Sequence, residues 1–426
     1  MRPSAREAER GFPEAPAIAY CGGATRADGF LQPMAASDRP SLRLEAVADP
    51  AAIADLWRSV EEGGITAPFQ RSDWVAAWIA AGALSEGVRP LIVVGRFADR
   101  AAFLLPLVAE RRGGATIARR LGGSHASYCV GVWRPEAFAG IDPTELVAGL
   151  RDLGRREGVD AFALDAVPRL WEGRTHPLAS ALAARPTLDD AHAFRLDPSF
   201  ERLLAARNAG HKRKKLKQKE KLFTAAGGYR VATATTPDEV EATLSAFFAQ
   251  KAASLAARGI ADPFAAPGVR EAWRRLAVAS LGRDEPLLEL TRLEAGGAIR
   301  AVIGAAVEGE RLYALFASYA EDELARASPG ETLFFRHIEA ACARGLEIYD
   351  MGVGTERYKA SWCDERLELV DLRMPVNAKG RIFVALEALL GGLKAAIRRN
   401  PALWTVVRRL RARLAGRPAG EGSPED

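Results

Sequence analysis

The spacing of apolar residues divides the chain into two runs of elements with a similar order. The first run begins with an alternating strand near Ser41 and two helices, the second of which has Ser72 as its expected N-cap. The pattern then predicts two strands within 90–114, a strand over 124–133, a helix over 144–158 and a buried strand over 159–167.

The second run repeats this order after residue 197. It predicts a lysine-rich helix, a strand over 227–236, helices over 237–259 and 267–282, three antiparallel strands within 285–320, a helix over 328–345, a strand over 346–354, a short helix over 357–362 and a last strand over 367–376. Residues 380–415 predict two amphipathic helices that are divided at Asn400-Pro401.

Antiparallel strands and helices are mixed in both runs, which is typical of the α+β class. Because the order repeats, we predict two tandem domains, each with a mixed, mostly antiparallel sheet flanked by helices, and a C-terminal helical tail. The predicted boundaries are a disordered arm over 1–40, domains over 41–195 and 196–378, and a basic amphipathic tail over 379–426.

Positive charge is concentrated in two segments of a chain whose formal net charge is only +5. Residues 212–221 hold seven basic residues and one Glu, and residues 379–417 hold ten basic residues and one Glu. The rest of the chain is therefore acidic. Such basic segments attract phosphates, nucleic acid or an anionic membrane surface, although a lysine run can equally be a solvated helix face.

Cysteine and hydropathy patterns exclude several classes of protein. The four cysteines are scattered without a CxxC pair, which argues against a zinc site or a disulfide framework and fits a reducing, cytoplasmic compartment. Neither a transmembrane run nor a secretory signal is predicted. The basic tail adds the expectation of a peripheral contact with the inner face of a membrane.

The junction before the helix at 328–345 has features suited to an anion. Ser328-Pro329-Gly330 follows a strand, and the first N–H groups of the helix have no intrahelical partner. A pyrophosphate group fits such a helix start, and Arg326 lies just upstream. An ordinary capped strand-to-helix loop gives the same local pattern.

Three segments in this region together resemble one family. They are ASPGETL at 327–333, the strand G-x-x-x-Y-D-M-G at 345–352 and YKASW at 358–362. Their order resembles the GNAT acyltransferase superfamily, in particular the CelD/BcsL-type acetyltransferases, and the basic helix at 207–223 is similar to the helix before the core in that family. The resemblance covers about 200–376, and the architecture is also similar to the tandem-GNAT Fem-type aminoacyltransferases.

The resemblance implies transfer of an acyl group from acetyl-CoA or another acyl-CoA to an amine or hydroxyl of a small-molecule or glycan acceptor, without a metal. It suggests an N- or O-acetyltransferase of polysaccharide or cell-envelope biosynthesis. The cofactor-binding residues that it implies are Phe316, Ala317, Ser318, Arg326, Gly330, Glu331 and Thr332. A strand bulge at 316–319 would supply the N–H groups for the oxyanion.

Catalytic candidates follow from the same segments. Asp350 is the candidate general base, Lys359 would steady negative charge, and Tyr319 or Tyr313 would protonate the leaving thiolate, with Tyr313, Leu315, Ala317 and Tyr319 expected on one face of their strand. Glu356 is an alternative base. Each of these residues also has a structural interpretation: Asp350 as a cap, Lys359 as a solvated lysine, and the tyrosines as lining of the core or of a groove. The weakest candidate is a nucleophile pair of His125 with Cys129.

Two other functions stay open at this point. A Fem-like transferase would take an aminoacyl group from tRNA and use the lysine run for nucleic acid, although this run lacks interleaved aromatic residues. A degenerate GNAT fold without catalysis would act as a scaffold.

Overall fold

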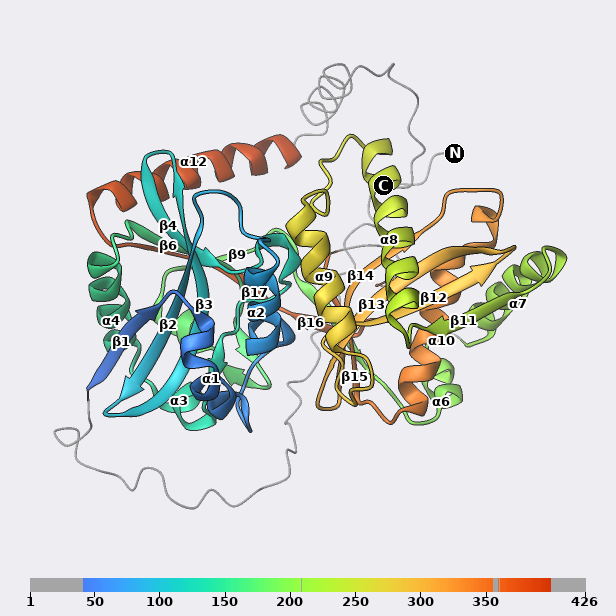
Figure 1. Ribbon diagram of the computed structural model, residues 1–426, viewed down its shortest axis with the longest axis horizontal. Coiled ribbons are helices and arrows are strands. Elements are labelled where there is room, and N and C mark those ends of the chain that lie inside the picture. Colours follow the sequence, from blue (N-terminus) through green and yellow to red (C-terminus); the bar gives the residue numbers. More distant parts are fainter. Residues whose placement is uncertain (1–40, 208, 355–358, 360, 400–426) are drawn as a thin grey trace, which may run out of the picture.

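The computed structural model describes residues 41–207, 209–354, 359 and 361–399, and it places two mixed sheets side by side with helices on their faces (Figure 1). This arrangement confirms the predicted α+β class. The expected disordered arm, the second tail helix and half of the predicted helix at 357–362 lie outside the described residues.

The first sheet has the strand order β1-β2-β3-β4-β6-β17-β9, and β5 pairs with β3. Its strands are β1 (Leu42–Val47), β2 (Arg89–Phe97), β3 (Arg100–Arg112), β4 (Ala115–Arg120), β5 (Val132–Trp133), β6 (Ala161–Pro168), β9 (Ala184–Pro186) and β17 (Leu369–Pro375). The helices of this half are α1 (Ala54–Glu61), α2 (Ser72–Ala80), α3 (Pro135–Gly140), α4 (Pro143–Arg156), α5 (Pro177–Ala181) and α12 (Ala378–Arg399). A two-stranded ribbon, β7 (Leu170–Trp171) with β8 (Arg174–Thr175), follows β6.

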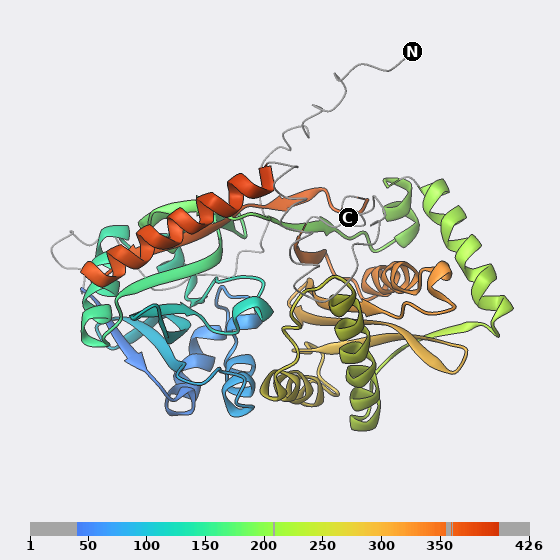
Figure 2. The same cartoon turned by 90° about the horizontal axis from the view of Figure 1, so that it is seen from above.

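The second sheet has the order β11-β12-β13-β14-β15-β10-β16. Its strands are β10 (Ala191–Arg195), β11 (Tyr229–Thr233), β12 (Glu289–Ala295), β13 (Ala298–Glu308), β14 (Arg311–Tyr319), β15 (Ile348–Val353) and β16 (Glu365–Leu367). Its helices are α6 (Phe200–Ala205), α7 (Ala209–Ala225), α8 (Pro237–Ala257), α9 (Pro267–Ala279) and α10 (Pro329–Ala343). Helices α8 and α9 cover one face of this sheet, and α6, α7 and α10 lie on the other (Figure 2).

The two sheets repeat one strand plan and exchange a strand. In each sheet an antiparallel meander is followed by one parallel pair, β4 with β6 and β14 with β15. The next position is filled by a strand from the other half of the chain, because β17 pairs with β6 and β10 pairs with β15. The two sheets therefore exchange β10 and β17 across the predicted boundary at 195/196, and α12 begins at the predicted boundary at 378/379.

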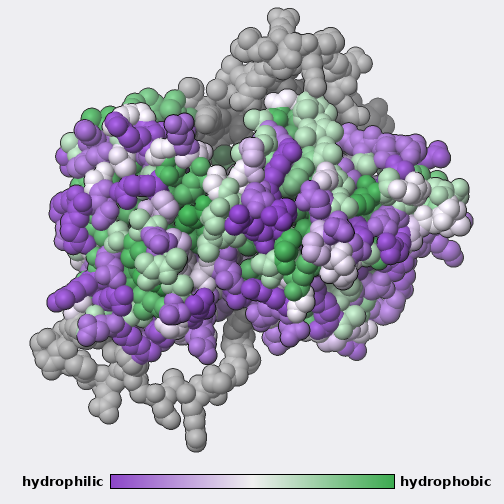
Figure 3. All heavy atoms as spheres, in the orientation of Figure 1, coloured by the Kyte–Doolittle hydropathy of each residue, from purple (hydrophilic) through white to green (hydrophobic). Residues whose placement is uncertain are grey.

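Aromatic packing joins the two halves between α2 and α9. The rings of Trp74 and Trp78 stack at 4.6 Å between centroids, and Trp273 of α9 meets Trp78 edge-on at 5.5 Å. The helices approach closely here because Gly268 has no side chain; a Cβ there would lie 2.3 Å from the carbonyl oxygen of Gly82. Green apolar patches lie near the middle of the surface in Figure 3, whereas purple polar residues dominate its outer rim.

Two local predictions in the first half are wrong, and the strand β4 was missed. Ser72 is the first residue of α2 and not its cap, and its N–H donates to the Glu61 side chain. Only Val132–Trp133 of the predicted strand 124–133 is a strand, because the glycine-bounded segment before it forms a buried loop between the sheets. The strand β4 was not predicted, since it is a six-residue element directly after Gly113-Gly114.

A bulge in β14 overturns the predicted common face of its tyrosines. Gly304 of β13 pairs with Phe316 and Ala305 pairs with Ala314, so that Leu315 is the extra residue. The strand therefore changes its alternation at this point. Tyr313 is buried against Tyr128 of the first half, whereas Tyr319 lies beyond the bulge with its ring 3.2 Å from the position a Gly330 Cβ would take.

Candidate functional site

The first turn of α10 presents backbone N–H groups without acceptors. Pro329 begins the helix, and Ser328 takes a left-handed conformation with φ of 47°, so its side chain does not cap the helix. In the described part of the chain no acceptor is found for the N–H groups of Gly330 and Glu331, whereas the N–H of Thr332 donates to the Ser328 carbonyl. This helix start has the polarity that favours an anion.

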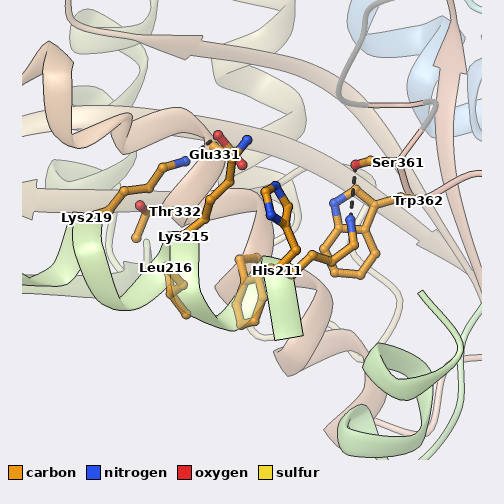
Figure 4. Close-up of a pocket in the computed structure, with 10 residues that line it drawn as sticks. His211, Lys215, Leu216, Lys219, Glu331, Thr332, Ser361 and Trp362 are labelled. Carbon is orange, nitrogen blue, oxygen red and sulfur yellow. Dashed lines mark hydrogen bonds and ion pairs between the residues drawn. The ribbon is translucent and has the colours of Figure 1, made fainter. Parts of the chain in front are cut away.

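A cavity of about 160 Å³ opens beside this helix start, between α10 and the lysine-rich helix α7 (Figure 4). The residues that line it are His211, Lys212, Lys215, Leu216 and Lys219 of α7, Glu331, Thr332 and Phe335 of α10, and Ser361 and Trp362. The predicted anion site at this helix start therefore has a second wall, which is formed by the lysines of α7.

The lysines of α7 line the cavity because of their spacing along the helix. Lys212, Lys215 and Lys219 are three and four residues apart and so share one face, whereas Lys217 and Lys221 do not line the cavity. Lys219 forms an ion pair with the Glu331 carboxylate across the cavity. Burial lowers the pKa of Lys212 to about 8, and its ammonium lies 4.0 Å from the Trp362 ring centroid and donates to Ser361 over 3.1 Å.

Thr332 places an unsatisfied hydroxyl at the wall of the cavity. Its side chain is fully buried, and its Oγ1 has no hydrogen-bond partner in the described part of the chain. A buried hydroxyl without a partner is unfavourable by roughly 1–3 kcal/mol, so proteins seldom keep one without a reason. A ligand oxygen in the cavity would supply the missing partner.

The predicted bulge residues lie on β14 next to this helix start. The actual bulge is Leu315, one residue before the predicted range 316–319. Phe316 is buried and stacks on Phe247 at 4.1 Å, Ala317 accepts a hydrogen bond from Lys251, and Ser318 donates to Gln250. Strands β14 and β15 pair only from Arg311–Ile348 to Tyr313–Asp350, so β14 runs on past its pairing with β15 toward α10.

Asp350 lies in a closed network between the two halves of the chain. It is 1% exposed and accepts hydrogen bonds from the Tyr128 hydroxyl at 2.8 Å and from the Gly352 N–H at 2.7 Å. Arg311 donates to it at 2.6 Å, and this carboxylate holds the pKa of Arg311 above its usual range despite burial. These contacts favour a structural role, and the predicted role as general base stays a prediction.

Lys359 is buried as well. It is 4% exposed, and its ammonium donates to the Val353 carbonyl at 2.8 Å, beyond the end of β15. The interpretation as a solvated lysine is therefore wrong. The alternative base Glu356 lies outside the described residues.

The structure gathers only part of the predicted site. Gly330, Glu331, Thr332 and Tyr319 meet at one place. Asp350 of β15 instead faces Tyr128 of the first half, and Lys359 binds the carbonyl group at the end of β15. Arg326 is exposed and has no ion pair among the residues that the structure describes. His125 and Cys129 do not form a pair, because His125 bonds to the Pro263 carbonyl while burial raises the pKa of the Cys129 thiol to about 12.

The sequence reasoning missed the cavity lysines as site residues. Their charge was noted, and their helical spacing was available as a signal, but nothing in the sequence shows which element α7 packs against. Tyr128 and Arg311 had no local signal, since their partner Asp350 is 222 and 39 residues away in sequence.

Comparisons with known proteins agree with this geometry. Residues 210–360 match the family described as "Acetyltransferase (GNAT) domain". The second half of the chain is therefore similar to this family over about a third of the whole sequence. No curated protein sequence matches the chain.

Two solved structures share the fold over more than three quarters of this chain. FemX is 10% identical with a TM-score of 0.51, over 77% of this chain and 96% of that one. A protein of unknown function from Bacteroides thetaiotaomicron is 10% identical with a TM-score of 0.50, over 78% of this chain and 99% of that one. A "Tandem GNAT protein from the clavulanic acid biosynthesis pathway" is 15% identical, with a TM-score of 0.45 over 79% and 99% of the chains. The two mixed sheets flanked by helices confirm the predicted tandem α+β fold, and FemX has a similar overall fold.

Other kinds of site are not seen in the described residues. No group of three or more His, Cys, Asp or Glu side chains within 41–207, 209–354, 359 and 361–399 is arranged to hold a metal ion. Over the same residues, each helix is too short or too polar to cross a bilayer. Cys129, Cys342 and Cys363 are free thiols.

Proposed function

We propose that the protein is an acyltransferase that takes its acyl group from an acyl-CoA, such as acetyl-CoA, and passes it to an amine or hydroxyl. The observation that carries the proposal is the cavity at the start of α10, where unpaired backbone N–H groups and the lysines of α7 converge. The match of 210–360 to a GNAT acetyltransferase domain supports the same reaction class. The CelD/BcsL-type assignment and the setting in polysaccharide or cell-envelope biosynthesis remain predictions.

The residues of the cavity fit the phosphates of such a donor. The N–H groups of Gly330 and Glu331, the Thr332 hydroxyl and the ammonium groups of Lys215 and Lys219 are all donors, and they present no carboxylate other than Glu331. The volume suits a diphosphate and not a whole CoA, so the rest of the donor would extend along β14 and β15. The thioester supplies the activated acyl group.

The protein's own groups would position the acyl group and polarise its carbonyl. Holding the carbonyl near the acceptor replaces a bimolecular encounter, and backbone N–H groups released by the β14 bulge would bind the developing oxyanion. Tyr319, which is 51% exposed, lies beside Gly330 and therefore at the diphosphate end of the proposed donor site, so its role as proton donor to the leaving thiolate stays a prediction.

Substitution of Thr332 by valine tests the donor site. Valine keeps the shape and removes a hydroxyl that has no partner, so the free protein should unfold at an unchanged or slightly higher temperature. Acetyl-CoA should stabilise the wild type by about 2.7 kcal/mol at a hundredfold excess over Kd. The variant should bind about tenfold more weakly, since one hydrogen bond to a charged group is lost.

The measurement is thermal unfolding with acetyl-CoA, with CoA and ATP as comparison ligands, together with release of free CoA thiol when amines and hydroxyl compounds are added. No stabilisation by any acyl-CoA would overturn the proposal. A destabilised Thr332→Val protein with unchanged binding would show that the hydroxyl serves the fold.

The pH dependence of acyl-CoA binding should follow Lys212. Because burial lowers its pKa to about 8, this lysine is charged below pH 8 and loses its charge as the pH rises through that value. Affinity should therefore fall by about tenfold between pH 7 and pH 9, as one charge-assisted contact is lost. Lys212→Arg should keep its affinity over this range, because arginine stays protonated. A flat wild-type profile by calorimetry would contradict this role.

The tRNA-dependent reaction remains the rival proposal. It predicts no response to acyl-CoA and a retention of tRNA that falls steeply with salt. A scaffold would bind neither.

A further inference from the structure

We infer that the outer face of α12 docks on an anionic lipid bilayer. Four large apolar side chains are exposed on this helix: Ile382 by 62%, Leu386 by 55%, Leu389 by 70% and Leu390 by 57%. They are spaced by four, three and one residues, so they form a stripe along one side of the helix. Among the large hydrophobic residues that are most exposed in the described chain, these four make up the largest group on one element.

The opposite face of α12 is already used by the fold. Phe383 and Val384 pack on the outer side of the first sheet against a small cluster with Ile117. Glu387 bonds to Arg119 and Arg373 of that sheet. Gly380 lies so close to the Asp160 carbonyl that no side chain fits there. The helix is therefore fixed in its rotation, and the apolar stripe is held outward.

The geometry suits a flat surface. Helix α12 lies on the outside of the first sheet, on the side away from α1 and α2, and its length follows β4 and β6 (Figure 2). Its 22 residues extend about 33 Å at 1.5 Å per residue. An amphipathic helix in such a position can bury its apolar side at the boundary between headgroups and acyl chains.

The charge of this segment selects an anionic surface. Residues 379–417 contain ten basic residues and a single acid, Glu387, whose carboxylate is turned inward to two arginines. Lys379 and Arg381 are exposed near the stripe, and five arginines follow in residues 400–417. Clusters of basic residues next to an amphipathic helix bind anionic lipids, and each Lys or Arg close to the membrane surface adds to the binding free energy. A protein partner that bound only through polar groups would leave the four apolar side chains exposed to water, whereas a bilayer buries them.

Vesicle flotation of the full chain tests this inference. We expect the protein to float with vesicles of phosphatidylglycerol and phosphatidylcholine and to remain in solution with phosphatidylcholine alone. Leu386→Ser/Leu389→Ser should reduce the floated fraction at least tenfold. The matched control, Leu170→Ser/Leu188→Ser, removes two other exposed leucines, which are 49% and 71% exposed, and should float like the wild type.

The variants change exposed side chains, and equal melting temperatures would verify that they fold. Absence of flotation with anionic vesicles would overturn the inference, as would flotation that the α12 substitutions leave unchanged. A dimer in light scattering that Leu386→Ser/Leu389→Ser dissolves, with no flotation, would assign the stripe to a second copy of the chain and overturn it too. None of these results depends on whether acyl-CoA binds.

Discussion

Replacing Lys215 and Lys219 together by glutamine should weaken the binding of acyl-CoA by roughly a hundredfold. Both side chains line the cavity at the start of α10, and Lys219 already holds the Glu331 carboxylate there. A hydrogen bond to a charged group contributes about 1.5–3 kcal/mol, so the loss of two corresponds to about 3 kcal/mol or more, and each 1.4 kcal/mol is tenfold in Kd. Removing Lys219 also leaves the Glu331 carboxylate to repel the phosphates.

The same helix offers a matched control. Lys217→Gln/Lys221→Gln makes an identical change in net charge at two exposed positions that do not line the cavity. Isothermal titration at physiological ionic strength should give a near wild-type Kd for this control, because salt at about 0.15 M largely screens exposed charges that lie farther than about 8 Å from the ligand. Equal weakening by both pairs would mean that α7 acts only through its overall field, and the assignment of the cavity as the donor site would fall.

Substitution of Asp350 by asparagine should lower the free energy of unfolding by about 3–5 kcal/mol. The change leaves the Arg311 side chain, which is only 16% exposed, charged and without its carboxylate partner. Removing one partner of a buried ion pair strongly lowers the stability of the fold. The loss should appear in denaturant unfolding followed by fluorescence of the tryptophans near this network, since Arg311 lies 5.2 Å from the Trp171 ring centroid.

A double-mutant cycle separates the structural role from the catalytic one. Arg311→Met/Asp350→Asn should be less destabilised than the sum of the two single variants, because no unpaired buried charge remains. Tyr128→Phe should cost about 1 kcal/mol, as one hydrogen bond is removed. If Asp350→Asn instead unfolds like the wild type and loses only turnover, Asp350 is the general base and the structural role is contradicted.

Local order along the chain was predictable because it depends on near neighbours. The periodicity placed most helices and strands, and Pro329 and Gly330 marked the start of α10. The charge count identified the lysine run. These features follow from helical and strand spacing, from caps and from composition, which act over a few residues. The resemblance of three short segments to GNAT proteins also rests on local sequence.

The tertiary structure decided what these local elements face. The packing of α7 against α10 turns a lysine run into one wall of a cavity, and the exchange of β10 and β17 interlocks the two sheets. Asp350 looked like a free base in sequence, yet Tyr128 and Arg311 enclose it. The bulge at Leu315 reversed the faces that strict alternation assigns to the tyrosines of β14. Such contacts join residues far apart in the chain, so burial and partner choice depend on the whole fold, whereas the sequence by itself determined the elements and their polarity.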